Sequence, residues 1–136
     1  MSLFNKDKEH SERSNPLSHL PSDYVKMIRQ QIGSNPDACN EDQIPQGYGK
    51  FGLEKTNPIP VYGIPSNEIY LDSLKLKDGG KFRWRRDGSI QVSNISHPID
   101  KYEIFDVDGN TICFLYISPY HWKISKMAPE GFIFRD

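Results

Sequence analysis

Three Asp-Gly pairs constrain the fold of this chain more than any other feature of its sequence. Asp-Gly supplies the positive φ angles that tight type I′ turns require, so each pair between two β-favouring runs predicts a hairpin. The pairs are Asp78-Gly79, Asp87-Gly88 and Asp108-Gly109. The runs around them predict an antiparallel meander of about five strands. These expected strands are Glu68–Lys75, Lys81–Arg86, Ser89–Asn94, Tyr102–Val107 and Thr111–Ser118.

The expected strands differ in the pattern of their two faces. Phe82 and Trp84 alternate with Arg83 and Arg85, which is the period of a half-buried strand with its aromatic side chains inward. The run Ile112–Ile117 is apolar on both faces. It therefore predicts a central strand that is covered on both sides.

An amphipathic helix is expected before the strands. Ser22 or Asp23 can cap its N-terminus, and Gly33 can end it. Its apolar stripe consists of Tyr24, Val25, Met27, Ile28 and Ile32. We expect an α+β fold in which this one N-terminal helix packs on the twisted antiparallel sheet, with a long Pro/Gly-rich loop over residues 37–62 around an edge.

The N-terminal sixteen residues are more polar than the rest of the chain. Leu3 and Phe4 are their only bulky apolar side chains, too few to offset the entropy cost of ordering them. We expect a flexible polar tail over residues 1–16 and a single α+β domain over residues 17–136. No run approaches the roughly 20 apolar residues of a membrane span, and no apolar core of a signal peptide is present, so we expect a cytoplasmic protein with no membrane partner.

Charge and cysteine content exclude some kinds of site. The chain has 17 Lys+Arg against 18 Asp+Glu, which argues against a chain-wide polycation for nucleic acid. Its two cysteines, Cys39 and Cys113, form neither a disulfide framework nor a metal pair, and we expect free thiols.

Two short motifs resemble ligand-binding loops only in part. Residues 106–110 lack the later ligands of a calcium loop, and the glycines of residues 47–52 do not precede a helix, as those of a dinucleotide-binding loop would. We therefore expect no metal and no cofactor.

One segment gathers groups that could perform catalysis. His121 follows the expected central strand and could act as general base for the hydroxyl of Ser125 or Tyr120, as in a small hydrolase or transferase. No nucleophile elbow, catalytic carboxylate pair or second histidine at metal spacing accompanies it. We therefore favour a protein that is not an enzyme.

A cluster of cations suggests a second alternative. Residues 75–86 hold Lys75, Lys77, Lys81, Arg83, Arg85 and Arg86, with Phe82 and Trp84 between them. Basic side chains beside aromatic rings can bind single-stranded nucleic acid. Strand alternation, however, places the two aromatic residues on the face opposite Arg83 and Arg85, which favours a solvated charged face instead.

Short motifs spread over residues 15–133 carry a family resemblance. They are Thr56–Val61, Tyr70-Leu71, Arg86–Ser89, Asp100–Glu103, Leu115-Tyr116, Tyr120-His121, Ser125 and Pro129–Phe132. With these motifs the chain resembles small uncharacterised bacterial single-domain proteins. The resemblance implies a bacterial origin and a stand-alone domain, and it carries no activity and no catalytic residue.

The favoured function is that of a protein-binding module. Aromatic residues on Pro/Gly-rich loops, together with arginines, are typical anchors of protein interfaces. The expected contact residues are Tyr48, Phe51, Tyr62, Tyr120, Trp122, Arg83 and Arg85. An immunity protein, a toxin inhibitor or an accessory protein would be such a module. The apolar segment Phe132–Phe134 could add an uncovered strand, which would also allow a homodimer.

Overall fold

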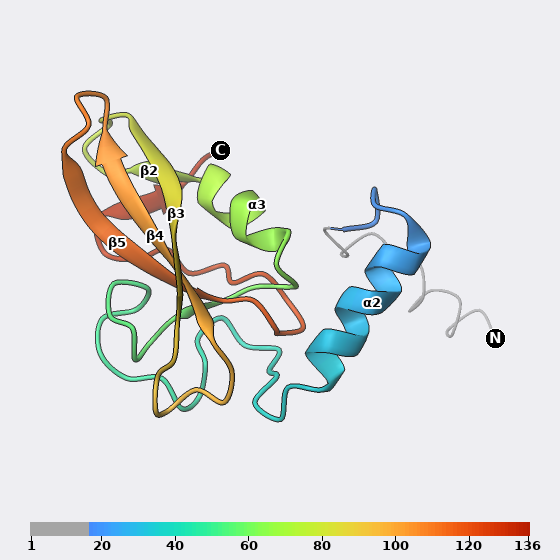
Figure 1. Cartoon of the computed structure of the whole chain (residues 1–136). Helices are drawn as coiled ribbons and strands as arrows, with labels where there is room; N and C mark the ends of the chain where they lie inside the picture. The colour runs from blue at the N-terminus through green and yellow to red at the C-terminus, as the bar shows by residue number, and fades with distance from the viewer. Residues whose placement is uncertain (1–16) are drawn as a thin grey trace.

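The computed structural model describes residues 17–136, so the expected tail over residues 1–16 lies outside the described residues. The described part is α+β, with two helices, a mixed four-stranded sheet and a two-stranded sheet (Figure 1). The helices are α2 (Ser22–Gly33) and α3 (Ser66–Asp72). The strands are β1 (Ile59–Pro60), β2 (Leu74–Leu76), β3 (Phe82–Ile90), β4 (Ile99–Asp106), β5 (Thr111–Ser118) and β6 (Phe132–Phe134). None of the described helices combines the length and the apolar character needed to span a membrane.

The main sheet has the strand order β1-β5-β4-β3. β4 runs antiparallel to both β3 and β5, whereas β1 lies parallel to β5 at the other end. β2 does not join this sheet and pairs antiparallel with β6 instead. The predicted antiparallel meander is therefore confirmed only for β3, β4 and β5. The five-strand version is wrong, because β2 pairs with the distant strand β6 and the distant strand β1 adds to β5 in parallel.

Only one of the three Asp-Gly pairs forms a hairpin. Asp108-Gly109 connects β4 to β5, and the amide of Gly109 donates to the carbonyl of Asp106 at 3.0 Å. Gly109 has a φ of 86°, while no described residue other than glycine has a positive φ, so the turn is not of the predicted type I′. Asp108, the turn residue before Gly109, therefore has a negative φ.

The other two pairs have different roles. Asp87-Gly88 lies inside β3 and forms a bulge, since Arg86 faces Tyr102 and Gly88 faces the next residue, Lys101. Asp78-Gly79 lies in the segment between β2 and β3, and these two strands belong to different sheets. The predicted strand over residues 68–75 is also wrong, because most of it belongs to α3.

Helix α2 is present, but its predicted packing on the sheet is wrong. Its buried residues Ile28 and Ile32 pack with Leu17 and Tyr62, and Figure 1 shows the helix standing apart from the sheet. Pro21 is its N-cap. The predicted cap at Ser22 or Asp23 is therefore wrong, since no side chain forms a capping hydrogen bond. α3, β2 and β6 cover the inner face of the main sheet instead, through a core of Tyr70, Leu71, Leu74 and Phe132 against Ile104, Leu115 and Ile117.

Strand β5 is covered on both faces only at its C-terminal end. Leu115 and Ile117 are fully buried on the inner face, whereas Ile112 at the start of the strand is exposed. On the outer face, Tyr116 packs against a small core of Ile44, Val92, Ile95 and Ile99, to which the Pro/Gly-rich loop and the loop after β3 contribute. The prediction of a strand buried along its whole length is therefore wrong for its first half.

Candidate functional site

A cleft of about 660 Å³ lies beside the inner face of β3 and β4. The start of α2, the start of α3 and the two strands each contribute to its walls. The lining residues are Leu20, Pro21, Tyr24, Ile64, Pro65, Glu68, Trp84, Arg86 and Tyr102. A mostly apolar hollow of this size with a few polar groups has the character of a binding site.

The strand side of the cleft is a fixed aromatic wall. The rings of Trp84 and Tyr102 pack edge to face, with their centroids 5.7 Å apart. The indole Nε1 of Trp84 also donates to Asp72 Oδ1 at 3.0 Å, which holds the ring in place. On the helical side, Tyr24 is 44% exposed and Ile64 is 48% exposed. The cleft thus presents apolar surface, and a ligand that covered this surface would be bound more tightly.

Polar groups form one end of the cleft. Arg86 Nη2 donates to Asp100 Oδ1 at 2.9 Å, and Asn67 Nδ2 donates to Asp100 Oδ2 at 2.8 Å. Burial raises the pKa of Tyr102, so its phenol stays protonated at neutral pH. Because the Arg86 side chain is half exposed, its remaining N–H groups are available to a ligand.

A smaller hollow of about 290 Å³ lies at the C-terminal end of α2. Its walls are more polar, and they consist of Gln31, Ser34, Asn35, Pro36, Ser96, His97 and Tyr120. The side-chain amide of Asn35 is engaged at both of its polar atoms, because Nδ2 donates to the carbonyl of Tyr120 and Oδ1 accepts from the backbone amide of Asp37 and the hydroxyl of Ser96. This hollow therefore offers fewer free polar groups than its lining suggests.

Two histidines and a serine form a chain of hydrogen bonds near this hollow, in which Ser118 and His121 are buried and His97 is partly buried. His121 Nδ1 accepts from the backbone amide of Cys39 at 3.1 Å. Neutral His121 therefore carries its proton on Nε2, which lies 2.8 Å from Ser118 Oγ. The Ser118 hydroxyl in turn lies 2.8 Å from His97 Nε2 and can donate its own proton there.

The predicted catalytic partners of His121 are engaged elsewhere. Ser125 Oγ donates to the carbonyl of Asp42 at 2.6 Å, and the ring of Tyr120 packs against His97. The structure brings Ser118 and His97 to His121 instead, and both Ser118 and His121 are fully buried. Burial, and secondly the charge of His97, lower the pKa of His121 to about 4, so this imidazole is neutral at pH 7.

The aromatic residues predicted to make contacts differ in their exposure. Tyr48 and Trp122 are exposed, whereas Tyr62 is buried and Phe51 packs against the main core. None of these four lines the cleft or the smaller hollow. Sequence reasoning missed the aromatic residues of the cleft, because it assigned Trp84 and the helix stripe to the core.

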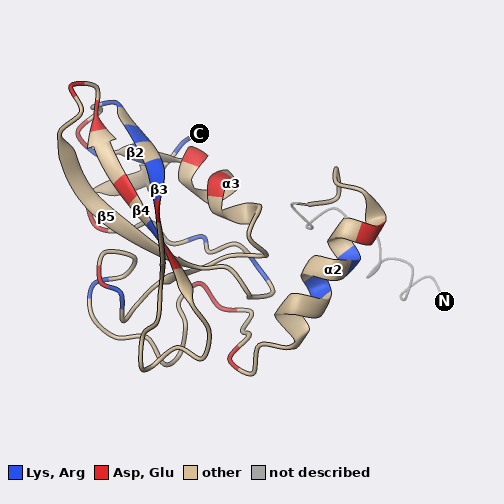
Figure 2. Ribbon diagram, viewed as in Figure 1, with Lys and Arg blue, Asp and Glu red and all other residues tan. Residues whose placement is uncertain are grey.

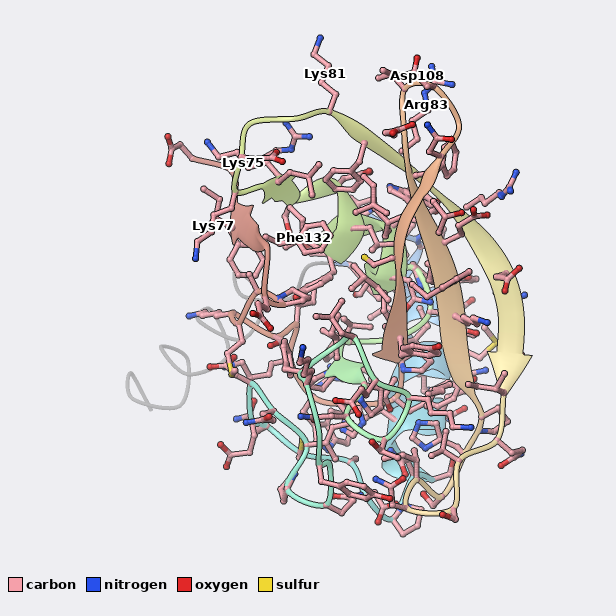
Figure 3. All side chains as sticks on the ribbon, turned by 90° about the vertical axis from the view of Figure 1, so that its left-hand side faces the viewer. Lys75, Lys77, Lys81, Arg83, Asp108 and Phe132 are labelled. Atoms are coloured by element: carbon pink, nitrogen blue, oxygen red, sulfur yellow. The ribbon has the colours of Figure 1, made fainter. Side chains whose placement is uncertain are left out.

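The predicted basic hairpin is divided between two sheets. Arg85 Nη2 lies 2.7 Å from Glu103 Oε1, and Arg86 is paired with Asp100. The other cations of this segment have no ion pair among the described residues. Figure 3 shows them in two groups, with Lys75 and Lys77 at the second sheet and Lys81 and Arg83 near the start of β3.

Neither a metal site among the described residues nor a known relative indicates the function of the cleft. Within residues 17–136, no group of three or more His, Cys, Asp and Glu side chains could hold a metal ion. Comparisons with family models, with curated proteins and with solved structures gave no match to the chain. The functional proposal therefore rests on the geometry of the cleft.

Proposed function

We propose that this protein is a binding module for another protein, and that the cleft receives apolar side chains of the partner. The observation that carries the proposal is the open aromatic wall of Trp84 and Tyr102 opposite the exposed side chains of Tyr24 and Ile64. Aromatic residues that are already fixed lose little conformational entropy when a partner covers them. Each apolar side chain of about leucine size that enters the cleft would add roughly 1.5–3 kcal/mol.

The arrangement favours binding over catalysis. Ser118 is the hydroxyl that lies within hydrogen-bond distance of the two histidines, and it is fully buried, so it is not exposed to a substrate. The groups at the polar end of the cleft, Arg86 and Tyr102, can donate hydrogen bonds and fix orientation. The cleft can thus recognise a ligand without a nucleophile.

Selection of displayed random peptides against the whole protein tests this function. Peptides that bind in the cleft are expected to lose at least about tenfold in affinity for the Ile64→Asp variant, since they would bury an unpaired carboxylate. The matched control is Val107→Asp, at a 71% exposed position in the turn between β4 and β5. Selected peptides that bind both variants equally well, or the absence of any enriched peptide, would contradict the proposal.

A further inference from the structure

Strand β3 leaves one edge of the main sheet open. It is the last strand in the order β1-β5-β4-β3, and no other strand of the described residues pairs with its outer edge. Over Phe82–Arg86 its pairing with β4 is regular, and the bulge comes only after this stretch. Every second residue of an edge strand directs its N–H and C=O groups away from the sheet. The stretch can therefore pair with a further strand.

The cleft opens beside the same stretch. Trp84 and Arg86 are inward-facing residues of β3, and both line the cleft. If a strand lay beside β3, its inward side chains would lie next to Trp84 and opposite Tyr24 and Ile64. Charge alone could serve to keep an edge strand from aggregating, but that role does not require an apolar cleft along the same residues.

The outer face of the stretch is positively charged. Arg83 and Arg85 lie on this face by alternation, Lys81 comes directly before the strand, and Figure 2 shows blue segments along β3. Glu103 accepts from Arg85 Nε and from Thr111, so it neutralises one of these cations. Lys81 and Arg83 have no carboxylate partner among the described residues.

We propose that the partner binds as an extended segment that adds a strand to β3, with alternating apolar and acidic residues. The apolar side chains enter the cleft, and the Asp or Glu side chains between them face Lys81 and Arg83. This inference rests on the proposed function, to which it adds the conformation and the residue pattern of the ligand. It uses the known mode of recognition in which backbone hydrogen bonds give affinity and alternate side chains give specificity.

Two other occupants of the edge fit less well. Pairing β3 with β3 of a second copy would bring Lys81 and Arg83, which have no carboxylate partner among the described residues, close to the cations of the other copy, and like charges on facing strands repel. Single-stranded nucleic acid would match the cations, but it has no backbone amides to pair with a strand edge. An acidic extended polypeptide satisfies both the edge and the cations.

Synthetic peptides of alternating Val and Glu, capped at both ends, test the charge pattern by calorimetry with the full chain. They are expected to bind at least about tenfold more tightly than peptides of alternating Val and Lys. Arg83→Glu should remove this preference. The control Lys55→Glu makes the same charge change at an exposed position outside β3, and it should preserve the preference. Equal binding of the two peptides, or tighter binding of oligothymidylate than of the Val-Glu peptide, would overturn the inference.

Backbone methylation tests the added strand. Two versions of the Val-Glu peptide carry N-methyl groups on alternate residues, one version on the valines and the other on the glutamates. Only one set of amides can face β3, so one version should lose at least about tenfold in affinity while the other keeps it. Equal affinity of the two versions would exclude strand addition.

The same variants separate this inference from the proposed function. If selected peptides depend on Ile64 but are insensitive to Arg83→Glu and to N-methylation, the cleft binds a partner and strand addition is wrong. If the Val-Glu peptide depends on Arg83 and is insensitive to Ile64→Asp, the edge binds a partner and the cleft does not. If no peptide binds, both proposals fail.

Discussion

The Cγ2 atom of Ile28 in α2 lies so close to the backbone of Gly63 that a β-carbon at position 63 would overlap with it. Gly63 also has a φ of 84°, a conformation that other residues rarely adopt. The contact holds α2 against the loop that leads into α3. Since the starts of both helices line the cleft, the shape of the cleft depends on this contact.

Gly63→Ala is expected to destabilise the protein by about 2–4 kcal/mol, as the sum of backbone strain and overpacking. Gly79→Ala is the matched control, because Gly79 has the same φ of 84° and nothing within 4 Å of an added β-carbon. The control should cost only the strain, about 1–2 kcal/mol. Urea unfolding measures both values, and an equal loss in the two variants would show that the contact with Ile28 does not matter.

The sequence contained the signal for α3, but polar residues obscured it. Asn67, Tyr70 and Leu71 are fully buried at the spacing of one helical face. Asn67 does not count as apolar, and Ile69 and Leu71 alternate with polar residues as a strand would. Asn67 is buried because Asp100 and Tyr102 accept its hydrogen bonds, and those residues lie far along the chain.

The Asp-Gly pairs show why strand pairing could not be predicted locally. Each pair has the same local chemistry, yet one forms a hairpin, one forms a bulge and one lies between strands of different sheets. The α+β class and the β4–β5 hairpin followed from local patterns. The pairing of β2 with β6 and of β1 with β5 depends on residues brought together only by the whole fold.

The cleft was equally hard to predict. Its lining residues come from three separate parts of the chain, around residues 20–24, 64–68 and 84–102. Trp84 alternates with arginines as a core residue would, and in the structure it contacts the core on one side and the cleft on the other. Periodicity identifies the inward face of a strand but does not show where the cover over that face ends.

Asp106 stabilises the hairpin between β4 and β5. Its Oδ1 accepts from the amides of Asp108 and Asn110, at 3.0 and 2.9 Å. Asp106→Ala is therefore expected to lower the free energy of unfolding by about 1–2 kcal/mol. Asp108→Ala, in the same turn, removes no side-chain hydrogen bond found within residues 17–136 and should change it by less than about 0.5 kcal/mol. Equal effects of the two variants in urea unfolding would contradict this role.

The two thiols should react slowly in the folded protein. Burial raises the pKa of Cys113 to about 11, and it also raises the pKa of Cys39. Because the thiolate is the reactive form, alkylation by iodoacetamide at pH 8 is expected to be slower at both positions than in the unfolded chain, and slowest at Cys113. Mass spectrometry of timed samples gives the two rates. Alkylation of Cys113 as fast as in urea would contradict the burial of its thiol group.

His121, which is buried, and His97, which is partly buried, should make stability depend on pH. Unfolded His121 gains a proton as the pH falls below about 6.5, whereas the folded residue stays neutral until about pH 4. The free energy of unfolding should therefore fall by about 2 kcal/mol between pH 7 and pH 5, and His97, whose pKa burial also lowers, acts in the same direction. His121→Gln retains a donor and an acceptor but does not titrate, so urea unfolding of this variant should show a clearly weaker dependence on pH. A dependence equal to that of the wild type, or an NMR signal of His121 that titrates near pH 6.5 in the folded protein, would contradict the buried hydrogen-bond chain through Ser118.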